Sequence, residues 1–186
     1  MAETQPTNIY EQRRDELYAA IADAVSDCRN LLDFGCGDCE LSVYLAKRLK
    51  VPVQGIDIAR QDFSDAFERV RKARVKRLVD CRQGDAERLA DVPDKSFSCA
   101  VSKWVLHELA HPVRALREIR RVLLPGGKIV CCDFTKNSLA TQLWGERYFT
   151  PGQAAALLKR AGFVRVSVLP VLDGHAMLAI GHRRRA

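Results

Sequence analysis

The chain has 186 residues, of which 47% are hydrophobic and 28% are charged, enough for one domain with a sizeable apolar core. No apolar segment approaches the ~20 residues of a membrane span, and the residues after Met1 do not resemble a secretion signal. We therefore expect a cytoplasmic protein without a membrane span, whose seven cysteines are reduced thiols.

The net charge of +7 has a local origin. Six lysines and arginines lie between residues 69 and 77, and three more arginines lie at 183–185. The rest of the chain is close to neutral, which makes a nucleic-acid partner unlikely. We interpret the run at 69–77 as a solvated face on the side of the sheet away from the ligand.

The first elements in the chain predict a ligand site. Apolar residues at helical spacing from Ile9 to Val25 indicate one lid-like or packing helix over 9–29. An apolar strand at 31–34 then leads into Gly35 and Gly37, and a helical pattern begins at once over 41–49. Glycines let the backbone approach a ligand closely, and the start of a helix offers free N–H groups to it.

The remaining elements alternate along the chain. We expect strands at 51–57, 78–85, 97–104, 128–134, 165–172 and 176–181. We expect helices from 63 into the basic run at 69–77, at 112–123 and at 151–160, with a short helical piece at 87–89. This order predicts an α/β fold with a doubly wound, Rossmann-like, mostly parallel seven-stranded sheet. Asp173-Gly174 predicts a hairpin that adds an antiparallel strand at the C-terminus. We expect one domain, 1–186, made of an N-terminal lid at 1–30 and a core at 31–186.

Acidic residues around the glycine turn distinguish two kinds of ligand. Asp57 follows Gly37 by about 20 residues, a distance at which an acid binds ribose hydroxyls. Asp33, Asp38 and Glu40 crowd the turn itself. Carboxylates there would repel the diphosphate of a dinucleotide but suit a positively charged sulfonium, although Asp38 and Glu40 also fit a helix cap and a first-turn acid. We therefore favour S-adenosylmethionine.

Several segments together resemble class I S-adenosylmethionine-dependent methyltransferases, in particular the group of ubiquinone/menaquinone-biosynthesis enzymes. The segments are Asp33-Phe34-Gly35-Cys36-Gly37, Gly55-Ile56-Asp57, Gly84-Asp85-Ala86, Val105-Leu106-His107-Glu108-Leu109 and Leu124-Pro125-Gly126-Gly127. The region from Phe149 to Phe163 also looks like that group. The resemblance implies the fold, the cofactor and methyl transfer, but it does not specify the acceptor.

The resemblance also implies a role for each residue around the cofactor. The turn Gly35-Cys36-Gly37 would admit the methionine part, and Asp33 would hold its ammonium group. Asp57 would bind the ribose hydroxyls, with Ile58 against the adenine. Asp85 would accept from the adenine amino group with Ala86 beside it, and Ser102 and Lys103 would pass under the methionine. The family often has a third glycine where Cys39 stands.

Candidates for chemistry follow the fourth predicted strand. His107 has the pKa class of a general base for a phenol, enol or thiol, with Glu108 beside it, but it also fits a structural histidine at a helix start. Trp104, Tyr10, Trp144 and Tyr148 could line a substrate pocket or pack in the core. A single Cys36-x-x-Cys39 is weak evidence for a metal site, and we expect none.

We therefore predict that the protein transfers a methyl group from S-adenosylmethionine to a small-molecule acceptor by in-line displacement. An RNA or protein methyltransferase, or a non-catalytic S-adenosylmethionine-binding partner subunit, are the alternatives. The sequence does not specify the acceptor atom or the oligomeric state.

Overall fold

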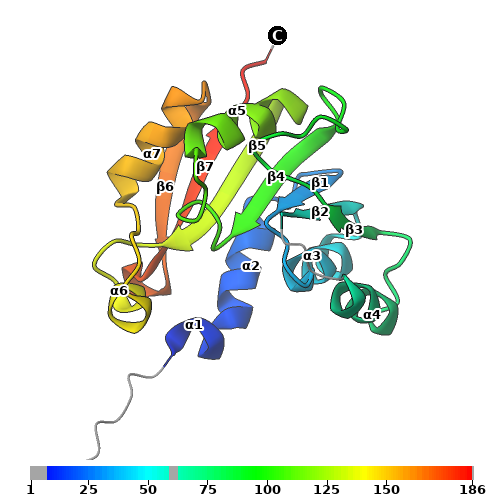
Figure 1. Ribbon diagram of the computed structural model, residues 1–186, viewed down its shortest axis with the longest axis horizontal. Coiled ribbons are helices and arrows are strands. Elements are labelled where there is room, and N and C mark those ends of the chain that lie inside the picture. The colour runs from blue at the N-terminus through cyan, green and yellow to red at the C-terminus, as the bar shows by residue number, and fades with distance from the viewer. Residues whose placement is uncertain (1–7, 59–62, 186) are drawn as a thin grey trace, which may run out of the picture.

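The computed structural model describes residues 8–58 and 63–185 and contains a seven-stranded sheet of order β3-β2-β1-β4-β5-β7-β6 (Figure 1). The strands are β1 (Leu31–Phe34), β2 (Val53–Asp57), β3 (Val79–Gln83), β4 (Phe97–Lys103), β5 (Leu123–Phe134), β6 (Val164–Val171) and β7 (Ala176–His182). The first five are parallel, whereas β7 runs antiparallel between β5 and β6. The predicted fold class and its closing hairpin are therefore confirmed.

Helices cover both faces of this sheet (Figure 1). They are α1 (Ile9–Gln12), α2 (Arg14–Ala24), α3 (Glu40–Leu49), α4 (Ser64–Lys72), α5 (Pro112–Val122), α6 (Leu139–Trp144) and α7 (Pro151–Arg160), with a 3-10 turn η1 (Leu172–Gly174). One apolar core packs α1, α2, α3, α4 and α6 against one face of the sheet. A second apolar core packs α5 and α7 against the other face. The strand order reverses between β1 and β4, so ligands are expected at the carboxyl ends of these strands.

Three local expectations were wrong. The helix over 9–29 breaks at Arg13, whose side chain pairs with Glu16 and with Asp173 far along the chain. The piece at 87–89 is a turn, held because the Glu87 N–H donates to Asp85. The third difference is α6, a short helix between β5 and α7 where no helix was predicted.

Strand β5 begins earlier than expected and passes through the Pro125-Gly126-Gly127 segment. A Cβ on Gly127 would lie 2.8 Å from the carbonyl oxygen of Ser98, so only glycine lets the two strands approach there. The segment therefore continues the sheet instead of only ending α5.

The cysteines differ from the expectation of seven reduced thiols. Cys28 and Cys99 form a disulfide with Cα atoms 5.9 Å apart, and Cys39 and Cys81 form another at 6.9 Å. The three other cysteines are free and buried. Each pair joins residues at least 42 positions apart, so the pairing follows from the folded sheet and could not be read from spacing.

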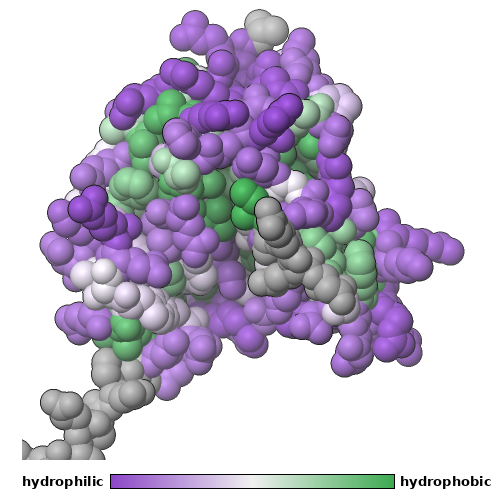
Figure 2. Space-filling view, in the orientation of Figure 1, coloured by the Kyte–Doolittle hydropathy of each residue, from purple (hydrophilic) through white to green (hydrophobic). Residues whose placement is uncertain are grey.

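The face of the molecule in Figure 2 is mostly hydrophilic, and its hydrophobic residues form small separate patches. Among the described residues the large exposed hydrophobic side chains are Ile58, Phe67, Trp144 and Leu169. Within the same part of the chain, every helix is too short or too polar to cross a bilayer.

Candidate functional site

A cavity of about 580 Å³ opens at the carboxyl ends of β4 and β5, between α1, α2 and the segment that holds α6. Figure 1 shows the arrowheads of β4 and β5 pointing toward this end of the molecule. All four aromatic residues expected in a substrate pocket line this cavity together with both catalytic candidates: Tyr10, Trp104, Trp144, Tyr148, His107 and Glu108. The structure thus brings six predicted residues into one place, although their roles remain to be proposed.

The aromatic walls of the cavity are packed against one another. Trp104 stacks on Phe134 with ring centroids 3.8 Å apart, and Tyr10 meets both rings edge-on. The Tyr10 hydroxyl accepts a hydrogen bond from the backbone N–H of Ala140 in α6, which ties the N-terminal helix to the opposite wall. Trp104 has a left-handed backbone (φ 62°), a conformation that costs a non-glycine residue about 1–3 kcal/mol.

His107 is held between two carboxylates. Its Nδ1 lies 2.6 Å from Oδ1 of Asp133, and its backbone N–H donates to Oδ2 of the same residue at 2.9 Å. Asp133 is almost fully buried in β5. On the other side of the ring, Nε2 lies 3.2 Å from Oε2 of the half-exposed Glu146. An Nδ1–H that donates to Asp133 makes Nε2, beside Glu146, the position at which the ring gains or loses its second proton.

These contacts shift the pKa of the groups around the cavity. Burial opposes the charged form of His107, but the hydrogen bond to Asp133 and the nearby acids outweigh it and raise its pKa. Burial also raises the pKa of the Glu108 carboxyl, with a further contribution from Glu146. The Tyr148 hydroxyl has a pKa raised to about 12 by burial and by Glu146. His107 is therefore the group in this set suited to exchange a proton near neutral pH.

A second polar network closes the cavity on the side of the glycine turn. Lys103 Nζ donates to the hydroxyl of Tyr18 at 3.0 Å, and that hydroxyl donates to Oε2 of Glu40 at 2.8 Å. Arg14 pairs with the other carboxylate oxygen of Glu40 at 2.8 Å. The cavity wall therefore continues from His107 to the start of α3.

The glycine turn has the geometry that its sequence predicts. Gly35 and Gly37 have φ values of 71° and 51°, and a Cβ on Gly37 would meet nothing within 4 Å. The Gly37 N–H donates to Oδ2 of Asp57 at 2.7 Å, which places the ends of β1 and β2 side by side. Asp33 is buried below the turn and accepts from the Ser42 hydroxyl at 2.6 Å.

The carboxylates near the turn are more neutralised than the sequence argument assumed. Asp38 pairs with Arg69 and Glu40 pairs with Arg14, so these two acids present little net negative charge to a ligand. The Arg69 contact also shows that the basic run begins beside the turn instead of lying wholly away from it. The charge argument against a diphosphate is therefore weaker than expected from sequence.

The other predicted cofactor residues lie along the same edge of the sheet. Ile58 follows β2 with 68% of its surface exposed, and Asp85 with Ala86 follows β3. Lys103 lines the cavity, but Ser102 is fully buried, so its side chain faces the core. Cys36 is also buried and points under the turn.

The sequence did not identify several polar residues of the site, among them Asp133, Glu146, Arg14 and Tyr18. Asp133 carried a usable signal, because a lone acid inside an apolar strand must find a partner in the fold. Glu146 and Arg14 lie in polar segments, where nothing in the sequence distinguishes them from solvated charges.

Comparison with known proteins decides the class. The profile of the family described as a methyltransferase domain matches residues 32–131. The chain belongs to this methyltransferase domain family. The family confirms the predicted resemblance to class I S-adenosylmethionine-dependent methyltransferases and implies S-adenosylmethionine as the cofactor.

Curated relatives of this chain include methyltransferases named for demethylrifamycin and for demethylmenaquinone. It is 36% identical over 104 residues to a 27-O-demethylrifamycin SV methyltransferase of Amycolatopsis mediterranei (strain S699), a match that covers 56% of this chain and 38% of that protein. It is 27% identical over 184 residues to a demethylmenaquinone methyltransferase of Anoxybacillus flavithermus, covering 82% and 77%. The chain spans 38% and 44% of the first two curated relatives.

Solved structures share the whole fold. The [4+2]-cyclase SpnF superposes with a TM-score of 0.80 at 21% identity, over 99% of this chain and 86% of that one. An S-adenosylmethionine-dependent methyltransferase from Aquifex aeolicus gives 0.76 at 22% identity, over 97% and 99%. At these identities the likeness shows the fold alone.

Proposed function

We propose that this protein transfers a methyl group from S-adenosylmethionine to a small-molecule acceptor, and that His107 removes the acceptor's proton. The observation that carries the proposal is the His107 imidazole, fixed by the buried Asp133 with Nε2 toward an aromatic cavity. When bound, the cofactor supplies an electrophilic methyl group on a sulfonium.

The residues at the ends of β1 and β2 fit this cofactor. The open space beside Gly37 allows close approach to the turn, and the exposed Ile58 offers an apolar surface to the adenine. We infer that Asp57, which accepts from the Gly37 N–H, binds the ribose hydroxyls, and that Asp33, below the turn, accepts from the ammonium group. The cations Lys103 and Arg14, on the turn side of the cavity, are suited to a carboxylate.

Each residue of the His107 group has a separate task. Asp133 holds Nδ1–H, so that Nε2 keeps its lone pair for the proton of an acceptor hydroxyl or thiol. Glu146 lies near enough to stabilise the imidazolium that forms. The packed rings of Trp104, Phe134 and Tyr10 keep water from the acceptor and hold it in line.

The cavity supports a compact acceptor with a flat apolar part. A volume of about 580 Å³ lies in the range of small-molecule sites, and its walls are largely aromatic. The relatives named for demethylrifamycin and demethylmenaquinone support a small-molecule acceptor in general.

A panel of acceptors tests the proposal. Purified protein is incubated with methyl-labelled S-adenosylmethionine and with quinols, phenols, thiols or RNA. We expect label on a phenol, quinol or thiol, and at least a 100-fold loss of rate in His107→Ala with unchanged cofactor affinity. Transfer to RNA alone, or cofactor binding without transfer to any class, would favour the RNA methyltransferase or the partner subunit instead.

A further inference from the structure

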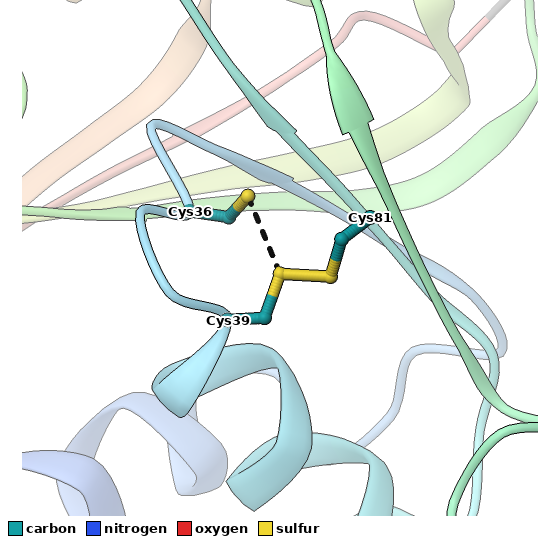
Figure 3. A group of neighbouring side chains, drawn as sticks. All are labelled: Cys36, Cys39 and Cys81. Carbon is teal, nitrogen blue, oxygen red and sulfur yellow. Dashed lines mark hydrogen bonds between the residues drawn. A yellow bond between two sulfur atoms is a disulfide. The ribbon is translucent and has the colours of Figure 1, made fainter. Parts of the chain in front are cut away.

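Three buried cysteines converge under the glycine turn (Figure 3). Cys36 lies in the turn, Cys39 at the N-cap of α3, and Cys81 in the middle of β3. The three Sγ atoms all lie within 4.8 Å of one another, and those of Cys36 and Cys39 are 3.5 Å apart. Cys36 and Cys39 are three positions apart, and Cys81 follows Cys39 by 42 positions, so only the folded chain brings the three sulfur atoms together.

The fold leaves a space for these sulfur atoms. A Cβ on Gly55 would lie 2.9 Å from Cys36 Sγ and 3.1 Å from Cys39 Sγ, so two of the thiols occupy the place of a side chain on β2. In the sheet, Gly55 is the direct neighbour of Cys81. Any larger residue at 55 would push the sulfur atoms apart.

The backbone at Cys39 indicates that its side chain has a role. Its φ of 61° lies in the left-handed region, where glycine is unstrained and another residue pays about 1–3 kcal/mol. Its side chain does not cap α3 by a hydrogen bond. The sulfur atom is the remaining feature that sets this residue apart from glycine.

We propose that Cys36, Cys39 and Cys81, when all three are reduced, bind one thiophilic metal ion such as Zn²⁺ or Cu⁺. Among the described residues these three form the group with ligand spacing, so any fourth ligand comes from solvent or from a small molecule. The ion joins the turn, the start of α3 and β3. This inference does not depend on the proposed acceptor chemistry.

The Cys39–Cys81 disulfide and the metal site exclude each other, because both use the same sulfur atoms. Opening the disulfide requires two electrons and two protons from a dithiol reductant, which becomes a disulfide itself. The ion then replaces the three thiol protons, which pass to solvent. The reduced protein is therefore the form that binds.

Titration with Cd²⁺ after reduction by a phosphine tests the site, because cadmium thiolates absorb in the ultraviolet. We expect one equivalent to bind, and at least 100-fold weaker binding in Cys36→Ala and Cys81→Ala. Cys131→Ala is the matched control, since Cys131 is a buried free thiol on the opposite face of the sheet. Its affinity should stay within twofold of the wild type.

A second measurement on the unaltered protein decides the matter even if the variants fail to fold. X-ray absorption of the reduced, zinc-loaded chain should count three sulfur ligands at about 2.3 Å. Two or fewer sulfur ligands, no binding by the reduced wild type, or equal affinity in a folded Cys36→Ala would overturn the proposal. Zn²⁺ and Cu⁺ compared in competition with a chelator show which ion the site prefers.

Discussion

The His107 imidazole lies between a buried and a half-exposed carboxylate, and these two partners have different tasks. Asp133 fixes the ring through its side chain and through the backbone N–H of His107. Glu146 acts by charge near Nε2. The sequence identified His107 as a candidate base because it follows β4 in a segment that resembles the methyltransferase family. It could not select its partners, because they come from other segments and only the folded chain brings them together.

Asp133→Asn separates orientation from charge. We expect kcat to fall by about 10- to 100-fold with KM little changed, since the imidazole loses the acceptor that fixes its tautomer. The rising limb of the pH–rate profile should move to lower pH, because Asp133 raises the pKa of His107.

Glu146→Gln is the matched control for that variant. It should move the rising limb in the same direction, with a much smaller loss of kcat. If Asp133 has only a structural role, Asp133→Asn would instead lower the free energy of unfolding and leave the pH–rate profile of the folded fraction unchanged.

We expect the charged Asp33 carboxylate to lower the free energy of unfolding near neutral pH while it contributes to cofactor binding. Burial raises its pKa from 3.8 to about 6, so the folded chain holds this proton more tightly than the unfolded chain. Its contribution to the free energy of unfolding is greatest below pH 3.8 and is lost as the pH rises through about 6.

We therefore expect Asp33→Asn to raise the free energy of unfolding at pH 7.5 by on the order of 1–3 kcal/mol. Cofactor affinity should fall by about 1–3 kcal/mol, because the charged acceptor is lost. Urea unfolding and calorimetry measure the two effects. A variant that is less stable and binds the cofactor normally would remove Asp33 from the site.

The turn between β1 and α3 is the element that we propose holds the cofactor, and its two glycines differ in their surroundings. Gly35 and Gly37 both have positive φ. A Cβ on Gly35 would overlap Val105 at 2.2 Å, whereas one on Gly37 would meet nothing. Val105 precedes His107 by two residues, so the turn packs directly against the segment that holds His107.

The two glycines form a matched pair of variants. Gly37→Ala should cost about 1 kcal/mol of stability through backbone strain alone. Gly35→Ala should cost about 1–3 kcal/mol more because of the overlap with Val105. Chemical unfolding of both variants checks this order, and equal losses would contradict it.

At the level of elements, periodicity and turn residues predicted the seven strands and four of the helices. The sequence did not predict the break at Arg13, because Arg13 pairs with Asp173 near the other end of the chain. α6 escaped because its six residues are too few to show a helical period. The early start of β5 depends on how closely Gly127 approaches Ser98, which no local pattern records.

At the scale of the whole molecule, the first cations of the basic run at 69–77 form ion pairs with nearby acids. Within the basic run, Arg69 pairs with Asp38, and Arg71 and Lys72 pair with Glu68. We expect RNA to bind no tighter than about 10⁻⁶ M at physiological salt. Fluorescence anisotropy measures this, and submicromolar affinity with a steep salt dependence would support an RNA substrate.

A series of phenols of decreasing pKa, drawn from the acceptor class that the protein methylates, tests the role of His107 most directly. Methyl transfer by wild type and by His107→Ala is compared at one pH. We expect a loss of about 100-fold or more for phenols that are neutral at that pH, and little loss for phenols already ionised. An equal loss across the whole series would contradict a base at His107 and assign this residue to structure.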